Sequence, residues 1–100
     1  MIANWSGYGF TVYPMNTNWY EVGGIYIFCG INPYNQWVAL YIGQADSFHK
    51  RIPSHEQWNP AARLGATHIH AMVVPLAANR DKIEAELIRV YQPALNIQLK

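Results

Sequence analysis

Glu84 occupies the position in this chain that most demands a charged partner. Residues 80–91 predict a helix, and at about 100° per residue its apolar side chains form one continuous arc. The members of this arc are Ile83, Leu87, Ile88, Val90 and Tyr91. Glu84 falls inside it, and a carboxylate on the buried side of a helix is costly unless it is paired, hydrogen-bonded or bound to a cation. We therefore expect Glu84 to bind a cation or to form an ion pair with Arg51 or Arg63.

Arg51 and His55 are four residues apart, so they would share one face of a continuous helix. A helix can begin just before them, because Asp46 or Ser47 offers a short oxygen side chain to the first free backbone amides. Pro53 interrupts this helix, since proline lacks an amide hydrogen and clashes with the carbonyl four residues before it. A kink, or a helix that restarts at Pro53, is expected between the arginine and the histidine.

A His-x-His pair, His68 and His70, is a second candidate for metal binding. Residues 66–74 alternate as a strand does, which places both histidines on the same face as Met72. Imidazole nitrogens at this spacing can hold a metal ion, although no third ligand is near in sequence. The alternative is that both histidines are surface or hydrogen-bonded residues.

A predicted antiparallel hairpin with arms at 23–29 and 37–43 has to position these groups. β-Branched and aromatic residues fill both arms, and glycine, asparagine and proline cluster between them. The period of two along a strand sends Tyr26 to one face and its neighbours to the other. Tyr26 and Tyr41 would stand beside glycines that permit close approach by another backbone or by a ligand. These glycines are Gly24 and Gly43.

The rest of the chain is predicted from its breakers and caps. Residues 1–22 are rich in aromatic residues and broken by glycine, proline and asparagine, which predicts a loop with one short strand near 9–13. Their aromatic rings are expected to pack over the open side of the sheet, with stacking on unpaired bases as the alternative. Residues 59–65 predict another loop. The last helix is expected to start at an Asn79 cap and to end before Pro93.

Composition limits the class of protein. One hundred residues, 51% of them hydrophobic, predict a single compact domain. No apolar run is long enough to span a membrane, and no signal peptide is expected. The lone Cys29 favours a reducing, cytoplasmic setting. Seven basic and six acidic residues give a formal charge of +1, so any nucleic-acid partner has to be held by a local patch.

Several of these residues, taken in order, resemble the motifs of the GIY-YIG nuclease family: Gly24-Ile25-Tyr26, Tyr41-Ile42-Gly43, Arg51, His55, Glu84 and Asn96. The resemblance covers about residues 23–96. It implies an α+β fold in which helices flank a small three-stranded antiparallel sheet. Residues 23–100 would form the nuclease-like domain, and residues 1–22 an aromatic N-terminal extension. The implied activity is hydrolysis of a DNA phosphodiester with one divalent cation, Mg²⁺ or Mn²⁺.

The resemblance also implies roles for single residues. Tyr26 corresponds to the tyrosine that activates or orients water, and Tyr41 to the second active-site tyrosine. Arg51 matches the arginine that contacts the scissile phosphate, and Glu84 matches the metal ligand. His55 lies where members of the family have a histidine or a tyrosine. Further substrate contacts are expected from Gly24, Gly43, Lys50 and Asn96.

These residue types suit phosphodiester hydrolysis. One hard cation on Glu84 can neutralise the phosphate and stabilise the leaving oxygen. Arg51 adds a permanently charged fork that matches phosphate geometry. Because a free tyrosine has a pKa of about 10, Tyr26 needs help to act as a base at neutral pH. His55 can supply it by taking a proton from Tyr26, or it can take one from water directly.

DNA is the expected partner, and no membrane partner is expected. Seven basic residues predict weak, salt-sensitive association, so a specificity-providing protein partner or a homodimer can complete the binding surface. The alternative function is a non-catalytic module that binds nucleic acid or protein and retains the GIY-YIG scaffold. The two functions differ in whether a bound duplex is cut when Mg²⁺ or Mn²⁺ is added.

Overall fold

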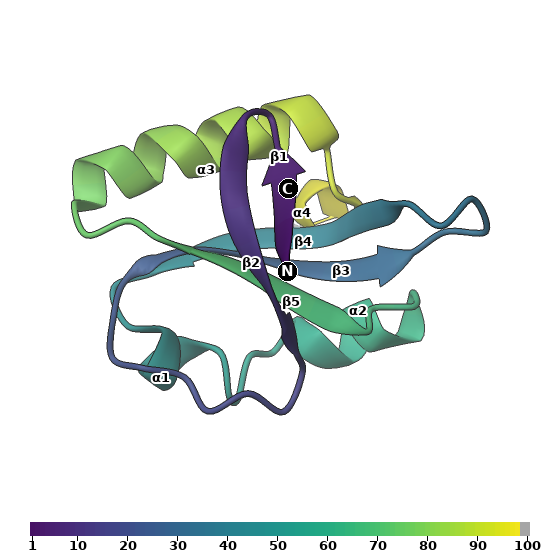
Figure 1. The fold of residues 1–100 in the computed structure, drawn as a ribbon, viewed down its shortest axis with the longest axis horizontal. Helices are drawn as coiled ribbons and strands as arrows, with labels where there is room; N and C mark the ends of the chain where they lie inside the picture. Colours follow the sequence, from purple (N-terminus) through teal and green to yellow (C-terminus); the bar gives the residue numbers. More distant parts are fainter. Residues whose placement is uncertain (99–100) are drawn as a thin grey trace.

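The computed structural model describes residues 1–98, which form one five-stranded antiparallel sheet with helices on both faces (Figure 1). The strand order is β1-β2-β5-β3-β4. The strands are β1 (Ile2–Trp5), β2 (Tyr8–Pro14), β3 (Gly24–Ile31), β4 (Trp37–Ala45) and β5 (His68–Val73). The helices are α1 (Phe48–Arg51), α2 (Trp58–Arg63), α3 (Ala77–Tyr91) and α4 (Ala94–Gln98). The α+β class is confirmed.

The central hairpin is confirmed, because β3 and β4 pair antiparallel with Tyr26 opposite Gly43. The register shifts by one residue between Phe28 and Cys29, so that β4 places two residues against one of β3. This bulge turns both Leu40 and Tyr41 toward the face of the sheet that carries Tyr26 and Phe28. We refer to this face as the tyrosine face.

The prediction of three strands was wrong, because β1 and β2 extend the sheet beyond β5. Ser6 and Gly7 join the two strands as a two-residue turn in which both residues have positive φ, 53° and 89°. Such a turn matches the twist of a hairpin, and it is available here because glycine carries no Cβ. β2 then pairs with β5, with Thr11 opposite Ala71. The division of the chain at residues 22 and 23 stays a prediction, and residues 99–100 lie outside the part described.

The helices follow the predicted positions only in part. Ser47 caps α1 by accepting a hydrogen bond from the Lys50 amide, as expected. No helix restarts at Pro53, and the next one begins at Trp58. Residues 59–63, expected in a loop, belong to α2, because a proline in the first turn of a helix loses no intrahelical hydrogen bond.

The last long helix starts earlier than predicted. α3 begins at Ala77 after the extended residue Leu76, and no side chain caps it, so Asn79 lies inside the helix. It ends at Tyr91, before Pro93, as predicted. The next residue, Gln92, has a left-handed conformation, and its amide donates to the Ile88 carbonyl.

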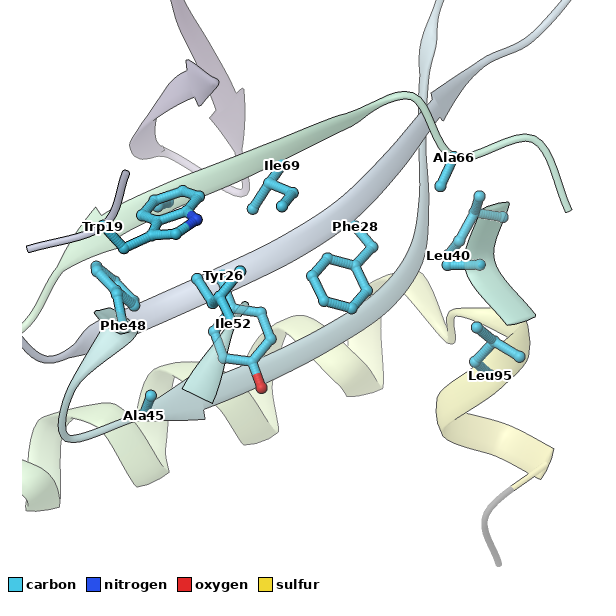
Figure 2. Packing of buried hydrophobic residues seen from close by; sticks show 12 residues of the cluster. Trp19, Tyr26, Phe28, Leu40, Ala45, Phe48, Ile52, Ala66, Ile69 and Leu95 are labelled. Carbon is cyan, nitrogen blue, oxygen red and sulfur yellow. The ribbon is translucent and has the colours of Figure 1, made fainter. Parts of the chain in front are cut away.

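Two hydrophobic cores lie on opposite faces of the sheet. On the face of the sheet that α3 covers, Leu87 packs against strand residues such as Ile25 and Ile27. On the tyrosine face, Figure 2 shows Tyr26 and Phe28 in the middle of the cluster, with Trp19 and Phe48 toward one end and Leu40 and Leu95 toward the other. The members of this second core are Trp19, Tyr26, Phe28, Leu40, Ala45, Phe48, Ile52, Ala61, Ala66, Ile69, Ala71 and Leu95.

The N-terminal aromatics mostly pack against the sheet, which was the first of the two expectations. Trp5, Phe10 and Trp19 are buried, whereas Tyr20 is 83% exposed. The Trp5 indole donates a hydrogen bond of 2.9 Å to Nδ1 of the fully buried His70. His68 Nδ1 lies 2.8 Å from the Thr67 hydroxyl. These contacts give the His-x-His pair hydrogen-bonded structural positions, the alternative to metal binding.

Within residues 1–98, no helix combines the length and the apolar character needed to cross a membrane.

Candidate active site

Tyr26 and His55 form the centre of the candidate site. The Tyr26 hydroxyl lies 2.7 Å from His55 Nε2, and the two side chains are 1% and 6% exposed. His55 Nδ1 accepts a hydrogen bond of 3.0 Å from the Gln57 amide, so the neutral imidazole carries its proton on Nε2. His55 therefore donates to the Tyr26 oxygen. With this tautomer, Nε2 has no free lone pair to take a proton from Tyr26, which argues against one of the two roles expected for His55.

The electrostatic surroundings keep both groups neutral. Burial raises the pKa of Tyr26 above its usual value, and the nearby Tyr41 and Glu84 add to this, while the Arg51 charge opposes it. Burial, followed by the Arg51 charge, lowers the pKa of His55 to about 4. Burial also raises the pKa of Tyr41. At neutral pH the site thus holds two phenols and one uncharged imidazole.

The glycines of the two tripeptide motifs make room for packing. A Cβ on Gly43 would lie 2.6 Å from the Tyr26 hydroxyl and from the ring carbon that carries it. Tyr26 can therefore lie across β4 only because Gly43 has no side chain. A Cβ on Gly24 would collide with the Met72 carbonyl of β5. Both glycines are buried, and their predicted contact with substrate stays a prediction.

Arg51 is held by a neighbouring carboxylate. Its two terminal nitrogens donate to the two oxygens of Glu56, each at 2.8 Å. This is the one ion pair within residues 1–98, and the side chains are 39% and 63% exposed. The hydrogen bond with Arg51 lowers the pKa of Glu56 to about 2. The guanidinium fork that should bind phosphate is therefore occupied by a carboxylate that presents the same pair of oxygens.

Pro53 shapes the approach of these residues. α1 ends at Arg51, and the turn that follows brings His55 back over the tyrosine face. Arg51 and His55 reach the same site from this turn, not from one continuous helix. Lys50 is exposed next to Arg51 and is available for the predicted contact with substrate.

Glu84 comes from α3, on the opposite face of the sheet, and meets β4, an edge strand. Its carboxylate accepts a hydrogen bond of 2.9 Å from Gln44, the residue that follows Gly43. It forms no ion pair with Arg51 or Arg63 in residues 1–98, so the ion-pair expectation was wrong. Its charge acts on both tyrosines, since it raises their pKa values after the larger effect of burial.

The surroundings of Glu84 fit a divalent cation. Its partner is a neutral amide, which leaves the carboxylate charge uncompensated, and carboxylate oxygen is a ligand that Mg²⁺ prefers. The described residues contain no group of three or more His, Cys, Asp or Glu side chains that could enclose a metal ion. A cation at Glu84 would therefore take its other ligands from water and phosphate oxygens, which is usual for Mg²⁺.

Asn96 supports the edge of the sheet. Its side-chain oxygen accepts from the Ile42 amide and its nitrogen donates to the Ile42 carbonyl, both at 2.8 Å. One asparagine thus pairs with β4 as a neighbouring strand would, between the two motif residues Tyr41 and Gly43. Its predicted contact with substrate stays a prediction.

Two residues of the site were missed from sequence, Glu56 and Gln44. Glu56 lies five residues after Arg51 across a proline, outside the spacing of helical pairs. Gln44 follows the second tripeptide motif directly, and the alternation of β4 turns it toward α3. That alternation is the one signal in the sequence that could have indicated its role.

Comparisons with known proteins give similarities of sequence and of overall fold. No protein-family model matches the chain. The chain is 33% identical over 85 residues to UvrABC system protein C of Methanothermobacter thermautotrophicus. The matched region covers 80% of this chain and only 14% of that longer protein.

Solved structures are similar over most of the fold. The GIY-YIG N-terminal endonuclease domain of UvrC from Thermotoga maritima, bound to its catalytic divalent cation magnesium, shares 27% identity with a TM-score of 0.62. The match covers 76% of this chain and 84% of that domain. A point mutant of that domain, bound to its catalytic divalent cation, shares 28% identity with a TM-score of 0.60, over 76% of this chain and 83% of that one.

Proposed function

Because the chain belongs to the GIY-YIG family, we propose that it is a divalent-metal-dependent endonuclease that hydrolyses DNA phosphodiester bonds. The observation that carries this proposal is the 2.7 Å hydrogen bond between the buried Tyr26 hydroxyl and His55. A phenol fixed in this way, near an arginine fork and an uncompensated carboxylate, suits hydrolysis of a phosphate ester better than binding alone.

Tyr26 is proposed to orient the attacking water. Because His55 donates to the Tyr26 oxygen, the phenol proton is free to point toward the reacting groups. If the phenol proton passes to a phosphate oxygen of the substrate, the His55 Nε2–H stabilises the resulting phenolate, which can then take a proton from the attacking water. His55 is thus a positioning residue, and Tyr41 lies beside it with ring centroids 5.1 Å apart.

Arg51 is proposed to bind the scissile phosphate, and Glu84 to hold the cation. Guanidinium and phosphate form the same bidentate arrangement that Arg51 now makes with Glu56, so the phosphate has to displace this carboxylate. A bound divalent cation, Mg²⁺ or Mn²⁺, would supply positive charge to the phosphate and to the leaving oxygen.

Cleavage assays test the function directly. The wild-type chain is expected to cut supercoiled plasmid or a branched oligonucleotide at low salt with Mg²⁺ or Mn²⁺, and Glu84→Ala to lose at least about a hundredfold in rate. Glu21→Ala removes an exposed carboxylate that is not among the predicted site residues and serves as the control. A folded wild type that binds DNA without cutting it would contradict the proposal.

The non-catalytic interaction module remains the second candidate function. Two observations favour it: the formal charge of +1, and the occupation of Arg51 by Glu56. A module of this kind would bind nucleic acid or protein equally well with and without Glu84.

Glu56→Gln is expected to tighten DNA binding by about two- to five-fold at low salt, because the amide competes less well with phosphate for Arg51. Fluorescence anisotropy with a labelled duplex measures the change, and the gain should shrink as salt screens the charges. Glu21→Gln removes the same charge elsewhere and should have a smaller effect. Weaker binding by Glu56→Gln would mean that Glu56 orients Arg51 and does not compete with the phosphate.

Partners and location follow from the same proposal. DNA is the proposed substrate, with a specificity-providing protein or a second copy of the chain as a further partner. The cytoplasm remains the predicted location.

A further inference from the structure

Gln44 bridges two carboxylates of α3 with one nitrogen. Its Nε2 donates to Asp81 Oδ1 at 2.7 Å and to Glu84 Oε1 at 2.9 Å. Asp81 and Glu84 are three residues apart on the helix, so they are neighbours on the side that meets β4. We infer that Gln44 is a positioning residue that fixes the carboxylate of the metal ligand Glu84, and that Asp81 anchors Gln44. This inference rests on the proposed function of Glu84.

The charges explain why this arrangement suits a ligand. Two carboxylates side by side repel each other, and neither forms an ion pair in residues 1–98. The Gln44 amide satisfies one oxygen of each without neutralising them, whereas a lysine or arginine in its place would compete with a cation. The hydrogen bond to Glu84 uses Oε1 and leaves Oε2 to face a cation.

The position of Gln44 couples the two halves of the site. It directly follows Gly43, over which the Tyr26 ring lies, and its side chain points to the opposite face of the sheet. One short stretch of β4 thereby sets the place of the tyrosine on one face and of the metal ligand on the other. Glu84 alone, on a long side chain with three rotatable bonds, would have no fixed direction.

The experiment measures Mn²⁺ affinity by calorimetry, without DNA and without turnover. Gln44→Met keeps the length of the side chain and removes the amide. It is expected to weaken Mn²⁺ binding about tenfold, because removing a group that hydrogen-bonds to a metal ligand typically lowers the metal affinity by about ten- to a hundredfold. Gln36→Met, in the exposed turn before β4, is the matched control and should bind as wild type does.

Glu84→Gln separates this inference from the proposed function. If Glu84→Gln abolishes Mn²⁺ binding and Gln44→Met weakens it tenfold, the result supports both Glu84 as the metal ligand and Gln44 as its positioning residue. Loss in Glu84→Gln with unchanged or tighter binding in Gln44→Met overturns the role of Gln44 and leaves Glu84 as the ligand. Wild-type affinity in Glu84→Gln overturns the metal assignment, and the role of Gln44 with it.

Asp81 is tested by a double-mutant cycle. If Asp81 acts by holding Gln44, Asp81→Asn weakens Mn²⁺ binding in the wild-type background and has little further effect in Gln44→Met. Fully additive losses would contradict this anchoring role, because they would mean that Asp81 acts on the cation directly.

Discussion

Tyr26→Phe is expected to lower the turnover number by about a hundredfold or more and to leave the fold intact, because the hydroxyl is the group proposed to orient water. The ring keeps its place over Gly43 and against Phe28 and Phe48. The substitution also leaves the buried His55 Nε2–H without an acceptor, which costs about 1–3 kcal/mol of stability. Single-turnover cleavage and thermal unfolding measure the two effects.

Tyr8→Phe is the matched control for this prediction. Tyr8 donates to Glu86 at 2.8 Å, so its loss also removes a tyrosine hydrogen bond, but one on the far side of the sheet from Tyr26. It should change stability and leave the turnover number unchanged. If Tyr26→Phe retains near wild-type turnover, the hydroxyl has no part in the chemistry.

Acidification from pH 7 to 4 is expected to destabilise the protein by up to about 6 kcal/mol through two buried histidines. Burial lowers the pKa of His55 and of His70 to about 4 in the folded state. The unfolded chain takes up these protons near pH 6.5, so the full stability exists above that pH and is lost as the pH falls toward 4. The difference corresponds to about 3 kcal/mol for each histidine, and the total is comparable to the stability of a whole small domain.

Urea unfolding at several pH values measures this loss. His70→Gln removes one of the two groups and should reduce the slope of stability against pH between 6.5 and 4. If His70→Gln fails to fold, proton NMR titration of the wild type decides the question. Ordinary pKa values near 6.5 for both histidines would contradict the prediction.

Local patterns predicted the centre of the sheet well. The alternation around Tyr26 and around His70 placed each residue on the correct face, because the period of two is unbroken along β3 and β5. The strand expected near residues 9–13 is present as β2, whereas β1 was missed because glycine, proline and asparagine in residues 1–22 favour a loop. The dipeptide Ser6-Gly7 was the signal of a hairpin turn. Asn79 resembled a helix cap, yet the helix begins two residues earlier, at the exposed Ala77 and Ala78, whose helix propensity is high.

The sequence predicted which motif residues form the candidate site, but it did not predict the hydrogen-bond partners of those residues. The motif residues are brought together around Tyr26, but the partners that decide their chemistry come from elsewhere in three dimensions. The Gln57 amide sets the His55 tautomer, Glu56 occupies Arg51, and Gln44 holds Glu84. Hydrogen bonds of this kind depend on where a turn or a strand end points, and a spacing rule contains no such information.

The pairing of β2 with β5 has a consequence for the order of folding. Thr11 lies opposite Ala71, so the N-terminal hairpin has to wait for some sixty residues of chain before its partner strand exists. During synthesis on the ribosome, β1 and β2 emerge first and expose Trp5 and Phe10, which are buried only when β5 arrives. These two strands are made before the rest of the sheet and are thus among the last to dock, and until then their unpaired edge is open to misassociation.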